Sequence, residues 1–156
     1  MRDQRLIRVE LPEEPPAPSA YAEADRRQAI ADLLAGNSFD PPNLPPGPYA
    51  LAVSVREGRL VLDIRDVDNR TLHVLALALG PFRRLIKDYH MVVEAHEQAV
   101  AQCGPESRVQ AIDMGRRGLH NEGAELLQQR LKGRVEVDFE TARRLFTLVC
   151  ALHQRI

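Results

Sequence analysis

The sequence lacks an apolar run close to the roughly 18 residues that a membrane-spanning helix needs. It begins with charged residues followed by prolines, so we expect no secretory signal. Its two cysteines, Cys103 and Cys150, lie 47 residues apart, too few for a disulfide framework and too distant for a thiolate metal site. These absences favour a cytoplasmic protein with reduced thiols.

Tryptophan is absent, aromatic residues make up only 4% of the chain, and the formal net charge is −1. A dedicated nucleic-acid-binding protein usually carries a strongly basic surface, and a single-strand binder also needs aromatic stacking platforms. The chain also lacks the GxGxxG, GxxxxGK(S/T), GxSxG and HExxH patterns. These absences oppose the common nucleotide-binding, hydrolase and metalloprotease templates, and we expect no cofactor.

What remains is the composition of an ordinary soluble globular protein, with 44% apolar and 28% charged residues. Its 156 residues suit one domain. The apolar patterns predict an α+β fold with an antiparallel sheet of three to five strands, covered on one face by helices.

Residues 1–48 form an N-terminal part that we expect to pack on the core of this one domain. Its expected elements are a strand over Arg5–Leu11 with Ile7, Val9 and Leu11 inward, and a helix over Tyr21–Ala35, capped by Ser19, with Ala24, Ile30, Leu33 and Leu34 apolar. Nine of the 11 prolines lie in Pro12–Pro18 and Asp40–Pro48. Because proline lacks a backbone donor, these stretches predict extended surface segments, with recognition by a proline-reading partner as the alternative.

Residues 49–156 carry the core, which begins with a predicted β-meander. Tyr49–Val55 and Leu60–Ile64 alternate around a Glu57-Gly58 turn, and Leu72, Val74 and Ala76 follow a second turn at Asp68-Asn69. The pattern predicts three antiparallel strands with one apolar face, which other elements must cover.

Helical patterns follow the meander. We expect a helix of about 22 residues from Pro81 to Cys103, followed by a shorter helix that begins with a Ser107–Gln110 capping box and is interrupted by Gly115 and Gly118. Asn121 should cap the next helix, which ends at Gly133, and a strand should follow within Arg134–Val137. Asp138 should cap the last helix, from Phe139 to about His153.

Three stretches resemble a known family when taken together: PFRRLIKDY (Pro81–Tyr89), AIDMGRRGLHNEGAELL (Ala111–Leu127) and VDFETARRLFTL (Val137–Leu148). With them the chain resembles the small bacterial proteins grouped as uncharacterised protein family 0262. The resemblance covers the chain from about Tyr49 to its end and is looser before it. Since no activity is assigned to that family, the resemblance implies no catalytic residue.

The densest polar cluster runs from Asp113 to Glu122 and is interleaved with glycines. Paired arginines suit a phosphate or carboxylate, glycines let a backbone approach a ligand, and a following helix N-terminus favours an anion. We therefore predict an anion-binding loop with Arg116, Arg117, Asn121 and Gly118 as ligand-binding residues and with His120, Asp113 and Glu122 as candidate catalytic residues. The alternative is structural: Asn121 caps a helix and the glycines form a tight corner.

Two further polar patterns are candidates for a binding site. Four Arg-Arg doublets occur, and Arg84, Arg117 and Arg144 would form a polyanion site if they converged. Adjacent helical residues lie about 100° apart, so at most one of each doublet can flank the core. His90 and Glu94 have chelating spacing but no third ligand nearby, so we expect no metal site.

Three functional hypotheses follow. The leading one is a non-catalytic binding or regulatory module that acts through a homo-oligomeric or heteroprotein interface, which predicts an exposed apolar patch. The second is a protein or enzyme that binds a small anion (phosphate, a nucleotide or a phosphorylated metabolite) through Asp113–Glu122. The third, RNA contact through the mildly basic C-terminal third, is opposed by the net charge.

Overall fold

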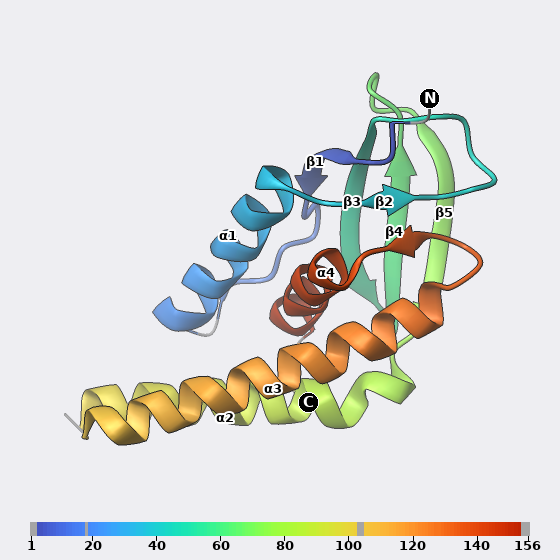
Figure 1. Cartoon of the computed structure of the whole chain (residues 1–156). Helices are drawn as coiled ribbons and strands as arrows, with labels where there is room; N and C mark the ends of the chain where they lie inside the picture. Colours follow the sequence, from blue (N-terminus) through green and yellow to red (C-terminus); the bar gives the residue numbers. More distant parts are fainter. Residues whose placement is uncertain (1–2, 18, 103–104, 154–156) are drawn as a thin grey trace.

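A computed structural model describes residues 3–17, 19–102 and 105–153. Its elements are β1 (Leu6–Glu10), α1 (Ala20–Ala35), β2 (Phe39–Asp40), β3 (Tyr49–Arg56), β4 (Arg59–Arg65), β5 (Thr71–Ala78), the 3-10 turn η1 (Gly80–Phe82), α2 (Arg83–Ala101), α3 (Glu106–Leu131), β6 (Glu136–Val137) and α4 (Phe139–Leu152). Four strands form one sheet in the order β1-β3-β4-β5, and β2 pairs with β6 in a second, small sheet. The helices pack beside the larger sheet (Figure 1), which confirms the predicted α+β fold.

The predicted meander is formed by β3, β4 and β5, which pair antiparallel in sequence order. Glu57 and Gly58 make the first turn, with φ angles of 51° and 73°. Positive φ angles at both residues are typical of a two-residue β-hairpin turn. β1 pairs in parallel with the other edge of β3, so the sheet is mixed rather than wholly antiparallel. The connection from β1 to β3 includes α1, and a parallel pair needs such a crossover.

The inward face of β5 differs from the prediction, which named Leu72, Val74 and Ala76. Leu75 and Leu77 are buried instead, whereas Val74 is 51% exposed. The two buried leucines lie opposite Leu62 and Leu60 of β4. Because β5 is apolar at both alternating sets of positions, its own pattern permits either face inward, and pairing with β4 decides between them.

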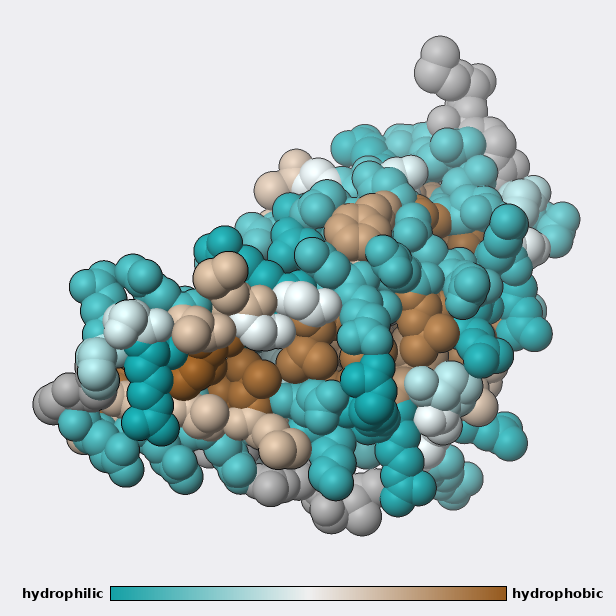
Figure 2. All heavy atoms as spheres, turned by 60° about the horizontal axis from the view of Figure 1, so that its bottom comes forward, coloured by the Kyte–Doolittle hydropathy of each residue, from teal (hydrophilic) through white to brown (hydrophobic). Residues whose placement is uncertain are grey.

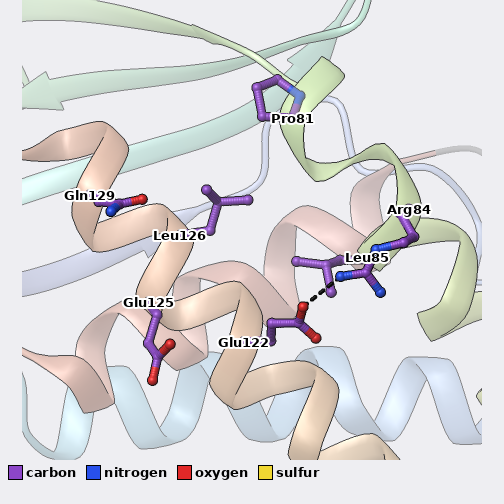
Figure 3. A pocket seen from close by; sticks show the side chains of 7 residues that line it. All are labelled: Pro81, Arg84, Leu85, Glu122, Glu125, Leu126 and Gln129. Atoms are coloured by element: carbon purple, nitrogen blue, oxygen red, sulfur yellow. Dashed lines mark hydrogen bonds and ion pairs between the residues drawn. The ribbon is translucent and has the colours of Figure 1, made fainter.

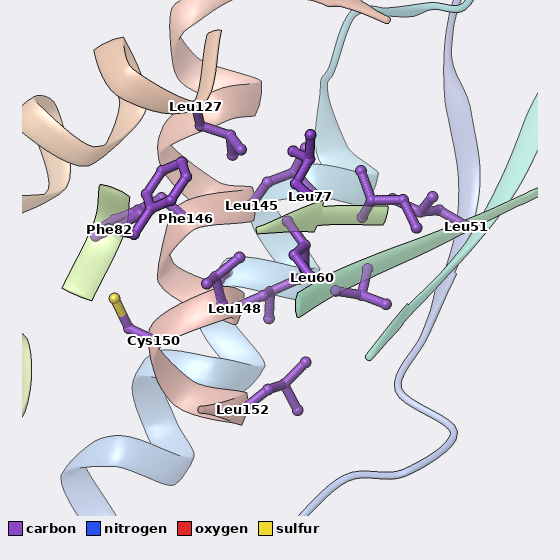
Figure 4. Packing of buried hydrophobic residues seen from close by; sticks show 14 of the residues in the cluster. Leu51, Leu60, Leu77, Phe82, Leu127, Leu145, Phe146, Leu148, Cys150 and Leu152 are labelled. Atoms are coloured by element: carbon purple, nitrogen blue, oxygen red, sulfur yellow. The ribbon is translucent and has the colours of Figure 1, made fainter. Parts of the chain in front are cut away.

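α4 is the central helix of the fold and contacts α1, α3 and β3. Asp138 caps it as predicted, since its Oδ1 accepts a hydrogen bond from the backbone N–H of Thr141 at 2.9 Å. Figure 4 shows Leu145 directed toward the leucines of the strands, while Phe146 lies on the side of Phe82. Apolar side chains all around a helix are typical of a core helix.

The predicted helix from Pro81 to Cys103 is present with adjusted ends. Gly80–Phe82 forms a short 3-10 turn, and α2 continues from Arg83 to Ala101. Cys103 lies outside the described residues. Over the part of the chain that is described, no helix combines the length and apolarity that membrane crossing requires.

α3 corrects the prediction of two shorter helices in this region. Glu106–Leu131 forms one continuous helix of 26 residues, which begins after Pro105 with no side-chain cap. The Ser107–Gln110 capping box is therefore not used, Gly115 and Gly118 do not interrupt the helix, and Asn121 lies in its interior. A glycine costs a helix interior only about 1 kcal/mol, and α3 compensates by packing against α2 and α4.

α1 connects the N-terminal part to the core. Ser19 caps this helix as predicted. Arg26, only 1% exposed, donates hydrogen bonds to Glu14 at 2.8 Å, to the carbonyl of Pro15 at 2.8 Å and to the carbonyl of Ala151 at 2.9 Å. One buried guanidinium thus joins the first proline-rich stretch and the end of α4 to α1.

Two inward faces of the N-terminal part also differ from the prediction. At the start of β1, Leu6 is buried and Ile7 is 38% exposed, where the register with β3 shifts. In α1 the buried residues are Ala22, Arg26, Ala29 and Leu33, while Ala24 and Leu34 are exposed. Of the predicted apolar set, Leu33 is buried and Ile30 packs against the core, so the prediction fails only at Ala24 and Leu34.

Candidate functional site

The predicted anion-binding residues lie along the middle of α3. Because this helix is continuous, the backbone amides of Gly118 and Asn121 lie within a helix rather than in a loop or at a helix N-terminus. The predicted loop over residues 113–122 is therefore wrong, and with it the backbone cradle for an anion. Anion binding by the side chains of Arg116, Arg117 and Asn121 stays a prediction.

The three candidate catalytic residues do not converge. His120 is buried in the core at 3% exposure. Glu122 is exposed and forms an ion pair with Arg84 of α2. Asp113 lies two helical turns before His120 and pairs with Arg116 at 3.6 Å.

The fold instead assembles an interhelical cluster, which consists of Tyr21 and Asp25 of α1, Tyr89 of α2, and Arg116 and His120 of α3. The Asp25 side chain is 12% exposed and accepts hydrogen bonds on both carboxylate oxygens. Tyr89 Oη donates to Oδ2 at 2.8 Å, and Arg116 Nη1 donates to Oδ1 at 3.2 Å. One carboxylate therefore links three helices.

His120 stacks inside this cluster on aromatic neighbours. Its ring centroid lies 5.8 Å from that of Tyr89 and 6.3 Å from that of Phe146. Burial lowers the pKa of His120 from 6.5 to about 4, and the opposing effect of the Asp25 carboxylate is smaller. His120 is consequently neutral at physiological pH. Its Nε2 atom is buried and has no hydrogen-bond partner among the described residues.

The two tyrosines of the cluster and the nearby Cys150 thiol also have raised pKa values. Burial raises the pKa of Tyr21 to about 12 and raises the pKa of Tyr89 further. Burial likewise raises the pKa of the Cys150 thiol, with the Asp25 carboxylate adding to the shift. A general acid or base works best with a pKa near the operating pH, so these shifts favour a structural role for the cluster.

Sequence reasoning missed Asp25, Tyr21 and Tyr89 as members of this cluster. Asp25 and Tyr89 are separated by 64 residues, and no motif connects them. One signal was available: Tyr89 lies on the apolar stripe of α2, and a buried tyrosine hydroxyl usually needs a hydrogen-bond partner.

A hollow of about 270 Å³ lies between the start of α2 and the middle of α3, lined by Pro81, Arg84, Leu85, Glu122, Glu125, Leu126 and Gln129. Figure 3 shows the Arg84 guanidinium directed at the Glu122 carboxylate. Arg84 also pairs with Asp88 at 3.3 Å. Because carboxylates already neutralise its one cation, this hollow does not favour an anion.

The arginine doublets serve different parts of the fold. Arg26 is buried beside exposed Arg27, and half-buried Arg116 precedes exposed Arg117, as the spacing predicts. Arg144 donates hydrogen bonds to backbone carbonyls at the end of α1, at 3.2 and 3.3 Å, and not to a partner shared with Arg84.

Metal-binding groups were sought as well. Within the described ranges, no three His, Cys, Asp or Glu side chains are grouped so as to hold a metal ion. The Nε2 atom of His90 lies 3.2 Å from the backbone carbonyl oxygen of His153.

The distal half of the α2–α3 hairpin exposes apolar side chains. We define the hairpin surface as Val100 of α2 with Val109 and Ile112 of α3; Met114, two residues beyond Ile112 and so about 200° further around the helix, lies on another side of α3. Val100 is 57% exposed and Met114 is 71% exposed, while Val109 and Ile112 are half-buried. Figure 2 shows apolar side chains reaching the surface of this region between hydrophilic borders.

Comparison with known proteins gives a family for the chain. The model of UPF0262, an uncharacterised protein family, matches residues 3–155. This span includes the N-terminal part, where the resemblance seen in the sequence is looser. No solved structure matches the chain.

Three bacterial proteins of the same family are among those similar to this chain. A UPF0262 protein of Granulibacter bethesdensis is 60% identical over 146 residues, which cover 88% of this chain and 82% of the relative. A UPF0262 protein of Acidiphilium cryptum is 57% identical over 152 residues, covering 97% and 93% of the two chains. One of Maricaulis maris is 49% identical over 154 residues, covering 98% and 96%. The chain therefore belongs to the uncharacterised protein family UPF0262.

Proposed function

We propose that this protein is a non-catalytic binding module that acts through a protein interface on the hairpin surface. The observation that carries the proposal is the 57% exposure of the apolar Val100, with Val109 and Ile112 only half-buried, on the distal half of the α2–α3 hairpin. A cytoplasmic location is part of the same proposal and rests on the sequence. The interhelical cluster is consistent with a non-catalytic role, because its tyrosine and histidine pKa values lie far from neutral pH.

The packing of α3 supports an interface at this end of the molecule. Across the described residues 106–119, which make up its first half, no side chain is buried. The buried residues of α3 begin at His120 and continue to Leu131. Since most helical stability in proteins comes from packing of an apolar face, a partner that covers the hairpin surface would stabilise the first half of α3.

We take the partner to be a second copy of the chain. Charges of both signs lie close in sequence to the hairpin surface, with Glu97, Glu106 and Asp113 against Arg108, Arg116 and Arg117. The net charge of −1 leaves little repulsion between copies. Two hairpins packed about a twofold axis would form a four-helix arrangement that buries both apolar surfaces and places opposite charges around them.

Sedimentation velocity over a protein concentration series tests this proposal. We expect the wild-type protein to dimerise, and we expect Val100→Arg and Ile112→Arg to remain monomeric at concentrations where the wild type is dimeric. Each variant places a charge in the apolar centre of the interface, where a desolvated charge opposes association.

Val67→Arg is the matched control, because Val67 is 50% exposed on the turn between β4 and β5. It should dimerise like the wild type. A wild-type protein that stays monomeric throughout the series, or a Val67→Arg variant that dissociates as readily as Val100→Arg, would refute association through the hairpin surface.

A further inference from the structure

A second, larger hollow of about 640 Å³ lies along α2, away from the residues of the hairpin surface. It is bordered by Gly58 in the β3–β4 turn, by Leu79 and Gly80 at the end of β5, and by His153 at the end of α4. Its volume falls within the range typical of small-molecule binding sites.

One part of the wall of this hollow is apolar. Leu79 and Ile86 belong to the buried core, each with 3% exposure, and both contribute to the wall. Met91 lines it as well and is 52% exposed. An apolar ligand segment placed against these three side chains would be removed from water, which favours binding in proportion to the buried area.

Two cations border the same hollow. Arg83 and Lys87 lie one turn apart on α2, so they project from the same side of the helix. Neither forms an ion pair with a carboxylate of the described residues, unlike neighbouring Arg84. Glu94, two turns beyond Lys87, is the one carboxylate among the described lining residues, so cations outnumber anions here.

We propose that this hollow binds an amphiphilic anion: a carboxylate head group held by Arg83 and Lys87, with an aliphatic body against Leu79, Ile86 and Met91. The paired cations select the head group, and the apolar wall selects the body. The site differs from the predicted anion site on α3, because its cations come from the first turns of α2 and have no carboxylate partner among the described residues.

Isothermal titration with three probes separates the two halves of the ligand. Decanoate, below its micelle-forming concentration, carries both the charge and the chain; acetate carries only the charge, and decanol only the chain. We expect decanoate to bind at least tenfold more tightly than either of the others. No binding of decanoate, or equal binding of decanoate and decanol, would overturn the proposal.

Variants that remove positive charge test where the head group binds. Arg83→Gln combined with Lys87→Gln should weaken decanoate binding at least tenfold. Arg70→Gln combined with Lys132→Gln is the matched control, since it removes the same two charges from exposed positions that do not line the hollow. Equal affinity in the two double variants would refute a head-group site at Arg83 and Lys87. Thermal unfolding of each double variant checks that its fold is unchanged.

Discussion

The phenolic hydroxyl of Tyr89 donates a 2.8 Å hydrogen bond to the carboxylate of Asp25, across 64 residues of sequence. Arg116 occupies the other carboxylate oxygen. Asp25 is therefore a point at which α1, α2 and α3 are tied together.

Replacing Tyr89 with Phe removes the hydrogen bond to Asp25 and should lower the free energy of unfolding by about 1.5–3 kcal/mol, the range for hydrogen bonds to charged groups. Tyr21→Phe is the matched control, because the Tyr21 hydroxyl is buried without a hydrogen-bond partner among the described residues. Removing it should be neutral or slightly stabilising. Urea denaturation measures both changes, and equal losses in the two variants would contradict the importance of the Tyr89–Asp25 bond.

His120 should make stability depend on pH between 6.5 and 4. Its pKa falls from 6.5 to about 4 on folding, so in this window the unfolded chain binds a proton that the folded chain does not. Stability is therefore greatest above pH 6.5 and decreases as the pH falls, by about 3 kcal/mol at pH 4 from this residue alone.

Denaturation of His120→Gln at several pH values isolates this contribution, because the variant should lose less stability than the wild type between pH 6.5 and 5. His73→Gln, which alters an exposed histidine of β5, should keep the wild-type slope. A His120→Gln slope as steep as that of the wild type would show that His120 does not cause the decline.

Glycines of α3 should respond oppositely to alanine. A Cβ at Gly123 would overlap the ring of Phe146, so Gly123→Ala should destabilise the protein by about 2 kcal/mol through overpacking. A Cβ at Gly115 or Gly118 meets no atom within 4 Å, so alanine there should stabilise the helix by about 0.5–1 kcal/mol. Thermal unfolding tests all three variants, and a marked loss of stability in Gly118→Ala would contradict a continuous α3.

The buried arginine of α1 should matter far more than its exposed neighbour. Arg26→Met removes the donor to the backbone carbonyls of Pro15 and Ala151 and one of the two arginine donors to Glu14, and it should cost about 3 kcal/mol. Arg27→Met removes ion pairs of a side chain that is 56% exposed and should cost less than about 1 kcal/mol. Limited proteolysis should also cut residues 12–17 faster in Arg26→Met; unchanged cleavage would argue that Arg26 does not hold this stretch.

Local sequence signals predicted the elements whose formation depends on neighbours in the chain. Ser19 and Asp138 cap the helices that follow them, and the Glu57-Gly58 turn connects two strands. In each case the interacting groups lie within a few residues, so the pattern of residue types contains the whole interaction.

Misassignments occurred where distant partners decide between local alternatives. Gly115 and Gly118 resemble a helix break, but packing against α2 and α4 keeps α3 continuous. The apolar residues of β5 permit two faces, and β4 selects the one with Leu75 and Leu77 inward. A difference of about 1 kcal/mol in local preference is smaller than the free energy of burying one face of a helix or strand.

Local sequence signals indicated the α+β class, the caps of α1 and α4, the hairpin turn and the family of this protein. The tertiary structure alone decided the parallel pairing of β1, the continuity of α3, the burial of Arg26 and the meeting of Asp25 with Tyr89 and Arg116. The physical reason is that caps and turns are satisfied by atoms a few residues away. Buried charges and strand neighbours, in contrast, depend on groups that only the folded chain brings together.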